Sequence, residues 1–84
     1  MSADEIARRK GFNRRFILSL GAFSDLVTFL SLLVSRYGRV LVVVPWTEEE
    51  LIIRLRRELF PNIEILTSTD LEGKVEIWVA DTGL

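Results

Sequence analysis

The sequence predicts one small α/β domain built on a sheet of three to four strands. We expect this sheet to be mainly parallel, with an antiparallel C-terminal hairpin and with helices packed on it. Three observations support this fold class: β-branched runs alternate with amphipathic segments, the run at 40–44 is apolar throughout, and only seven residues, 68–74, separate the last two strand patterns. Because a parallel crossover needs about a dozen residues or more, those two strands are expected to pair with each other unless another strand lies between them.

Residues 1–15 are expected to form a basic N-terminal helix and turn. Ser2 is a suitable N-cap, and Asp4 and Glu5 follow in the first turn, where the positive end of the helix dipole favours acids. Five basic side chains then gather close together: Arg8, Arg9, Lys10, Arg14 and Arg15. They form either a contact surface for phosphates or for a partner's acidic face, or the solvated basic end of a helix, and we favour the second interpretation. At most, we expect weak and salt-dependent nucleic-acid binding.

The stretch from Phe16 to Val34 is mostly apolar and carries a single charge, Asp25. Its length approaches that of a membrane-spanning helix. However, Gly21 interrupts it after an apolar run, and Ser24 begins a pattern typical of a helix start. We therefore expect a strand, a turn and a helix in a soluble, cytoplasmic protein, and the alternative is one long apolar helix over 16–34 that crosses a membrane.

The centre of the sheet is expected at Val40–Val44. A helix from about Asp25 to Arg36 precedes this run and ends at Gly38, whose conformational freedom suits a helix C-terminus. A continuous β-branched run that is stopped by Pro45 is typical of a strand buried on both faces. Val40–Val44 should therefore lie between two other strands.

The second half of the chain predicts one more helix and two more strands. Thr47, followed by three glutamates, has the pattern of a capping box, and this helix should end before Pro61. We interpret the glutamates as first-turn acids that suit the helix dipole and predict no metal site there. The strands follow at Ile63–Thr67 and Val75–Ala80.

The composition removes several kinds of chemistry. The 84 residues form a single domain, 1–84, and include neither Cys nor His. Disulfides, thiolate metal sites, cysteine nucleophiles and imidazole bases are therefore excluded, and we expect no cofactor and do not expect an enzyme. Arg outnumbers Lys nine to two and Gln is absent, which is compatible with a thermophilic source.

Charge is divided unevenly along the chain. Residues 1–42 carry seven basic groups and three acids, whereas residues 43–84 carry four basic groups and nine acids. Such a division can steer an anionic partner to one end of the molecule or favour head-to-tail association.

Two segments of the chain are similar to parts of superfamily 2 helicases. The segment "RVLVVVPWTEEEL" resembles their hydrophobic strand and the helix that follows it, and "VEIWVADTGL" resembles a later strand. The resemblance covers about residues 16–84 and implies a RecA-like or Rossmann-like nucleotide-binding fold. The phosphate loop of that family reads Gly-x-Gly-Lys-Thr, whereas this chain has Gly21, Ala22, Phe23, Ser24 and Asp25. Because the phosphate-binding Lys is missing, the resemblance implies a degenerate domain that does not hydrolyse ATP.

A second resemblance is to Rossmann methyltransferases. The segments "ILSLGAFSD", "GRVLVVV" and "NIEILTSTD" look like the first three strands of that family and their connections. This resemblance implies an S-adenosylmethionine site with Gly21 at the cofactor turn and Asp70 beside the adenine. The candidate cofactor-binding residues are thus Gly21, Ala22, Phe23, Ser24 and Asp70.

Two functions from different classes follow from these patterns. We favour a small non-catalytic α/β interaction or assembly module, and association with nucleic acid through the basic cluster is one form that this function can take. The alternative is a degenerate nucleotide- or S-adenosylmethionine-binding domain, and a single-span membrane protein is a third candidate. A mean hydropathy of +0.28 in so short a chain favours a homo-oligomer or a protein partner, and Trp78 is the most conspicuous candidate for an exposed apolar side chain.

Overall fold

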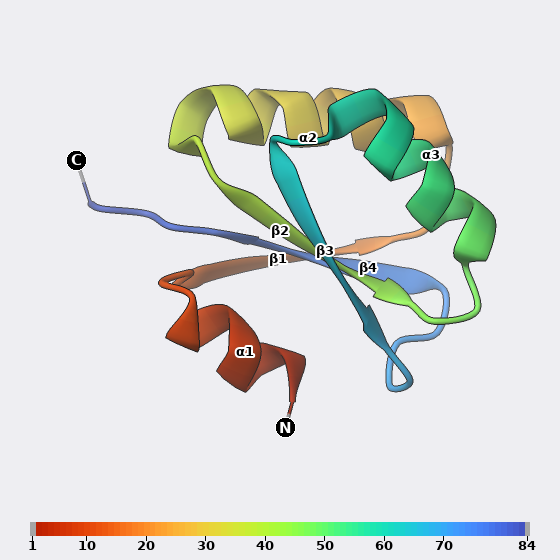
Figure 1. The fold of residues 1–84 in the computed structure, drawn as a ribbon, viewed down its shortest axis with the longest axis horizontal. Coiled ribbons are helices and arrows are strands. Elements are labelled where there is room, and N and C mark those ends of the chain that lie inside the picture. Colours follow the sequence, from red (N-terminus) through yellow and green to blue (C-terminus); the bar gives the residue numbers. More distant parts are fainter. Residues whose placement is uncertain (1, 84) are drawn as a thin grey trace.

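The structure, a computed structural model, describes residues 2–83. A four-stranded sheet lies between two helices on one face and one helix on the other (Figure 1). Along the chain the elements are α1 (Ala3–Arg9), β1 (Arg14–Ser19), α2 (Phe23–Tyr37), β2 (Val40–Pro45), α3 (Glu49–Leu59), β3 (Ile63–Ser68) and β4 (Lys74–Val79). Helices α2 and α3 cover the upper face in Figure 1, and α1 lies below the sheet.

The strand order is β1-β4-β2-β3. Strand β4 runs antiparallel to both of its neighbours, and β2 and β3 form the one parallel pair in the described sheet. The prediction of a mainly parallel, Rossmann-like or RecA-like sheet with a C-terminal hairpin is therefore wrong. Strand β2 lies between β3 and β4. The short connection from β3 to β4 therefore passes the end of β2, and β3 and β4 do not pair as a hairpin.

The side chains of β4 explain its interior position. Val75, Ile77 and Val79 point to the face that α2 and α3 cover, whereas Trp78 points to the opposite face, and all four are essentially inaccessible to solvent. A strand that is apolar on both faces gains most where both faces are covered. The expectation that Trp78 is exposed is consequently also wrong.

Strand β2 occupies the centre of the sheet, as the sequence predicts. Every residue from Val40 to Pro45 is buried, and the strand pairs with β3 on one side and with β4 on the other. Val40, Val42 and Val44 join the larger core beneath α2 and α3. Leu41 and Val43 face the smaller core beneath α1.

The apolar stretch 16–34 forms the strand, turn and helix that the sequence predicts. Strand β1 ends at Ser19, and α2 runs from Phe23 to Tyr37 with Gly38 as its C-cap, whose φ of 84° is a conformation that suits glycine. No helix within residues 2–83 combines the length and the hydropathy needed to cross a membrane.

Helix α1 begins as predicted, whereas α3 does not. Ser2 caps α1 by accepting a hydrogen bond from the backbone N–H of Glu5 at 3.2 Å. Helix α3 starts at Glu49, with Glu48 at its N-cap and no side-chain capping bond, so the predicted capping box at Thr47 is not formed. The N–H of Glu48 instead donates to the carbonyl of Pro45 at 3.0 Å, which closes a turn before the helix.

Candidate functional site

A hollow in the described surface lies where β1 leads into α2. It is an open groove of about 600 Å³ between the N-terminal halves of α2 and α3. Three of the predicted cofactor residues, Gly21, Ala22 and Phe23, line it, whereas Ser24 does not. Apolar side chains form its floor: Leu18, Leu20, Leu26, Leu51 and Val75.

Acidic side chains dominate the rim of this groove. Asp25, Glu48 and Glu50 line it, together with a single cation, Arg54, which lies over the ring of Phe23 at 3.9 Å from its centroid. This charge balance repels the phosphates of a nucleotide. Within residues 2–83 no three carboxylates come close enough together to hold a metal ion.

Asp70, the last predicted cofactor residue, lies elsewhere. It lines a smaller hollow of about 210 Å³ between β3 and α1, with Thr67, Ser68 and Ser2 among its neighbours. Strands β1 and β3 run in the same direction, so Gly21 and Asp70 lie at the same end of the sheet. However, β4 and β2 separate them, and the structure does not bring them into one site.

The predicted basic cluster is also divided, and its members contact the protein itself. Arg8 and Arg15 lie near the ring of Trp78, at 5.4 and 5.7 Å from its centroid, and Arg8 pairs with Asp4 at 3.3 Å. The indole N–H of Trp78 donates to Glu76 at 3.1 Å. The two arginines thus help to cover the smaller core.

Glu64 of β3 holds two further cations. Its carboxylate accepts hydrogen bonds from Lys10 at 2.9 Å and from Arg39 at 3.2 Å. The hydrogen bond from Lys10 is the main cause of a lowered pKa for Glu64, with Arg39 adding to it and partial burial opposing it. This pairing joins the end of α1 to the edge of the sheet.

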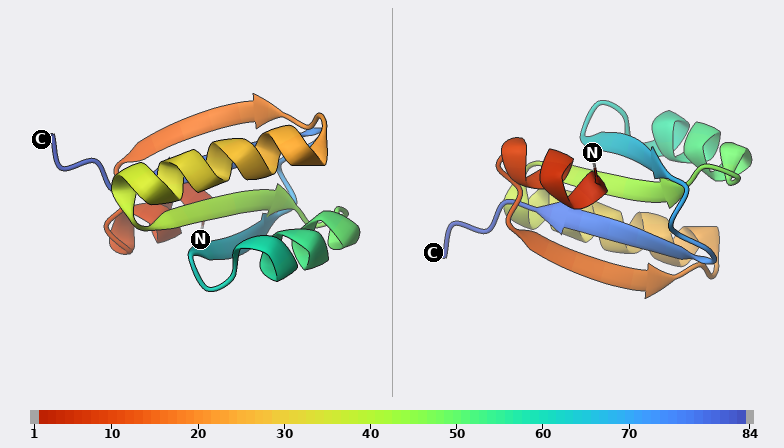
Figure 2. Two further views of the ribbon diagram at one scale, coloured as in Figure 1. Left: turned by 90° about the horizontal axis from the view of Figure 1, so that it is seen from above. Right: turned by 90° about the horizontal axis from the view of Figure 1, so that it is seen from below.

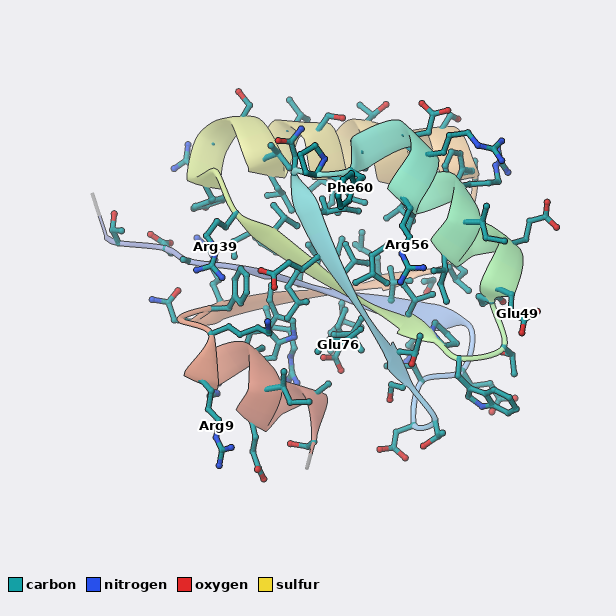
Figure 3. All side chains as sticks on the ribbon, viewed as in Figure 1. Arg9, Arg39, Glu49, Arg56, Phe60 and Glu76 are labelled. Carbon is teal, nitrogen blue, oxygen red and sulfur yellow. The ribbon has the colours of Figure 1, made fainter. Side chains whose placement is uncertain are left out.

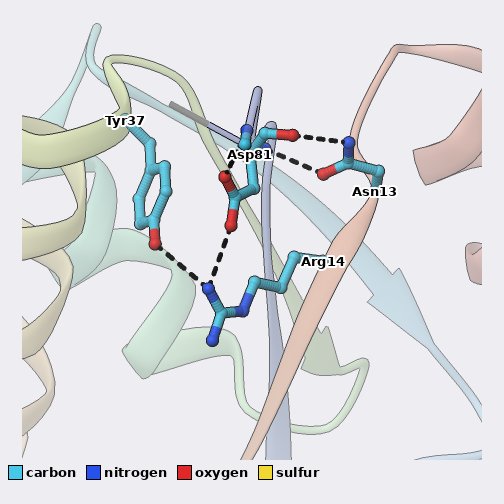
Figure 4. Close-up of polar contacts among 5 residues, drawn as sticks. Asn13, Arg14, Tyr37 and Asp81 are labelled. Atoms are coloured by element: carbon cyan, nitrogen blue, oxygen red, sulfur yellow. Dashed lines mark hydrogen bonds and ion pairs between the residues drawn. The ribbon is translucent and has the colours of Figure 1, made fainter.

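Arg14 belongs to a third group of contacts, at the C-terminal end of β4. Its guanidinium donates to Asp81 at 3.0 Å and to the Tyr37 hydroxyl at 3.5 Å (Figure 4). Asn13 and Asp81 exchange two hydrogen bonds of 2.8 Å, from the Asn13 amide to the Asp81 carbonyl and from the Asp81 N–H to Asn13 Oδ1. The pKa of Asp81 is lowered, first by the hydrogen bond from the Gly83 N–H and then by Arg14. No sequence pattern indicated this contact, because its two sides lie far apart in the chain.

Five large apolar side chains of the described chain remain exposed: Ile17, Leu32, Trp46, Ile53 and Phe60. Three of them, Trp46, Ile53 and Phe60, belong to α3 or to its immediate flanks. Their exposed fractions are 58%, 55% and 73%. None of the sequence patterns described above indicates this surface. The periodicity of α3 nevertheless contains the signal, since Ile53 lies off the buried stripe of Ile52, Leu55 and Leu59.

No family model matches this chain, and no curated protein or solved structure proved similar to it. The resemblances to superfamily 2 helicases and to Rossmann methyltransferases therefore rest only on the sequence segments quoted above. A function has to be inferred from the geometry of the fold.

Proposed function

We propose that the protein is a small non-catalytic interaction module whose contact surface is the outer side of α3. This surface, the α3 ridge, consists of Trp46, Glu49, Ile53, Arg56 and Phe60. The exposure of three large apolar side chains, one on α3 and two on the residues that flank it, is the observation that carries the proposal.

Four members of the α3 ridge share one side of the helix, and Trp46 lies in the turn that precedes it. At 100° per residue, Glu49, Ile53, Arg56 and the following Phe60 fall within an arc of about 60°. The buried stripe of α3 and the residues that line the groove beside α2 point in other directions. Figure 3 shows Glu49, Arg56 and Phe60 along the side of the molecule that carries the edge strand β3.

The ridge forms the outermost part of this edge of the molecule. Helix α3 runs along the outer side of β3, as the left view of Figure 2 shows. Trp46 belongs to the same edge, because its N–H donates to the carbonyl of Ser68 at the end of β3, at 3.0 Å. A partner can therefore reach the apolar side chains without a change in the fold.

The exposed area is large enough to favour association. Aromatic side chains present about 150 to 250 Å² each, so Trp46 and Phe60 at 58% and 73% exposure leave roughly 200 to 330 Å² uncovered. The largest apolar patch of a typical monomer measures about 300 to 600 Å² and is often a functional surface. Burial of this area against a partner supplies the hydrophobic driving force.

The remaining polar groups support a non-catalytic role. Most of the basic cluster lies against the protein's own acids and rings, and the chain has no His or Cys. The groove beside α2 has the apolar floor of a ligand site, but its acidic rim disfavours phosphate.

The groove nevertheless supports a second candidate function, a degenerate nucleotide- or S-adenosylmethionine-binding domain. A ligand at about 100 times its dissociation constant stabilises a protein by about 2.7 kcal/mol. Thermal unfolding with ATP, GTP and S-adenosylmethionine tests this candidate. A clear rise in the unfolding temperature that Gly21→Leu abolishes would favour it over the interaction module.

Site-specific photo-crosslinking tests the interaction module directly. A photoreactive amino acid in place of Phe60 should give a defined protein adduct in the cells that make this protein, and the additional substitution Ile53→Glu should abolish the adduct. The same amino acid in place of Ser31, which is exposed on α2, is the matched control and should give none. Absence of an adduct from position 60, or equal adducts from both positions, would contradict the proposal.

A further inference from the structure

We infer that the α3 ridge binds a second copy of this chain, with the two α3 helices antiparallel about a two-fold axis that passes beside Ile53. This inference rests on the proposed function and names its partner. A two-fold interface requires a surface that is complementary to itself, so that each residue meets its counterpart in both directions.

The α3 ridge meets this requirement along its length. Trp46 and Phe60 each stand seven residues from Ile53, on opposite sides of it. Glu49 precedes Ile53 by one helical turn, and Arg56 follows it by about one turn. An antiparallel copy therefore places Glu49 against Arg56 of the other copy and Ile53 against itself, and it brings the turn that carries Trp46 toward Phe60 of the other copy.

Charge complementarity fixes the antiparallel direction. Glu49 lies in the first turn of α3 and Arg56 in its last, and neither side chain has an ion-pair partner within residues 2–83. A parallel pair would set glutamate against glutamate and arginine against arginine. The antiparallel pair forms two Glu49–Arg56 contacts and also opposes the two helix dipoles.

The charges of the whole domain favour the same arrangement. Asp25 and the three glutamates 48–50 lie at the end of the sheet where α2 and α3 begin, and Arg36 and Arg39 lie at the opposite end, where α2 finishes. In an antiparallel pair the acidic end of each copy lies beside the basic end of the other. Long-range attraction therefore supports the short-range contacts.

The other exposed apolar side chains do not form a comparable surface. Ile17 lies on the face of β1 opposite to Phe16, and Phe16 packs against Phe29 of α2 at 5.7 Å between ring centroids. Leu32 belongs to the outer side of α2 itself. The two exposed side chains are thus on opposite sides of the sheet and cannot form one ridge.

The area of the ridge predicts a weak dimer. Trp46 and Phe60 from two copies contribute roughly 400 to 650 Å², whereas stable interfaces bury about 1,200 to 2,000 Å² in total. Ile53 and the stems of Glu49 and Arg56 add to this area. We expect a dissociation constant between roughly 10 μM and 1 mM, with rapid exchange between monomer and dimer.

Charge reversal gives the sharpest test. Glu49→Arg alone places arginine against arginine, and Arg56→Glu alone places glutamate against glutamate. In an equimolar mixture of the two variants, both contacts of the mixed dimer pair opposite charges again. We expect each variant alone to dimerise at least about tenfold more weakly than the unmodified chain, and the mixture to recover the association.

Sedimentation equilibrium from about 1 μM to about 1 mM measures these constants. Glu58→Arg is the matched control, because it makes the same charge change on an exposed side chain of α3 outside the ridge. It should dimerise like the unmodified chain, and its mixture with Arg56→Glu should associate less than the complementary mixture. Circular dichroism should show the same helix content in all variants.

Three results would overturn the inference: an unmodified chain that stays monomeric throughout this range, a dimer that neither charge reversal weakens, or a complementary mixture that fails to recover. A monomeric chain that still gives an Ile53-dependent crosslink to a different protein from position 60 would leave the proposed function in place and refute only the second copy as partner. Absence of both would refute both.

Discussion

Replacing Trp78 with alanine removes the largest side chain of the smaller core. The indole is fully buried, packs with Ala7, Phe12, Leu41 and Val43, and donates a hydrogen bond to Glu76 at 3.1 Å. Because α1 attaches to the sheet mainly through this cluster, the substitution leaves a cavity beneath α1 and weakens its attachment.

The expected loss is about 3 to 5 kcal/mol, the usual range for Trp→Ala in a core. A domain of 84 residues has a total stability of roughly 4 to 13 kcal/mol, so the loss is a large fraction of it. Phe at this position should recover part of the loss, because it refills much of the cavity.

Urea unfolding followed by far-ultraviolet circular dichroism measures this change, at protein concentrations well below the dissociation constant proposed above. Trp46→Ala is the matched control, since Trp46 is 58% exposed and its removal should change stability by no more than about 0.5 kcal/mol. A loss below about 1 kcal/mol for Trp78→Ala, or equal losses for both variants, would refute the packing of α1 described above.

Three further predictions follow from the same contacts. Because the pKa of Glu64 is lower in the folded state than its unfolded value of about 4.5, its carboxylate stabilises the fold at pH values above 4.5. This stabilisation is lost as the pH falls through the folded-state pKa. Glu64→Gln should therefore reduce the acid-induced loss of unfolding free energy, measured by urea titration from pH 7 to about pH 3. An unchanged pH profile would show that the pairing with Lys10 contributes nothing. Hydrogen exchange should find the amides of Leu41–Val43 among the slowest in the chain, because β2 is hydrogen-bonded on both sides, and fast exchange there would contradict its central position. Titration with duplex and single-stranded DNA at two salt concentrations should show weak binding that is lost at the higher salt concentration. The double substitution Arg14→Ala/Arg15→Ala should reduce this binding. Tight binding that salt does not affect would contradict a purely electrostatic contact.

The groove and the α3 ridge differ in how much of each could be predicted from the sequence. Gly21, Ala22 and Phe23 line the groove, and local turn signals suffice to place them at the end of a strand. Their expected partner, Asp70, lies across two strands, and strand order is not encoded in the turn signals. The α3 ridge was overlooked because apolar residues in an amphipathic helix are taken first as core, and only the width of the buried stripe shows that Ile53 falls outside it.

Local pattern by itself determined the elements of this protein. The β-branched run of β2, the turn at Gly21, the helix end at Gly38 and the Ser2 cap are all set by residues close in sequence, through backbone preferences and side-chain periodicity. These features require no knowledge of what lies across the sheet, so they could be predicted.

Only the tertiary structure decided which strands are neighbours and which charges meet. The short connection after β3 is compatible with a hairpin, but β4 gains more apolar burial between β1 and β2 than at an edge beside β3. That position buries Trp78, which in turn brings Arg8 and Arg15 over its ring, and β3 at the edge places Glu64 within reach of Lys10 and Arg39. Such contacts join residues far apart in the chain, and their energies depend on the whole packed arrangement rather than on any local pattern.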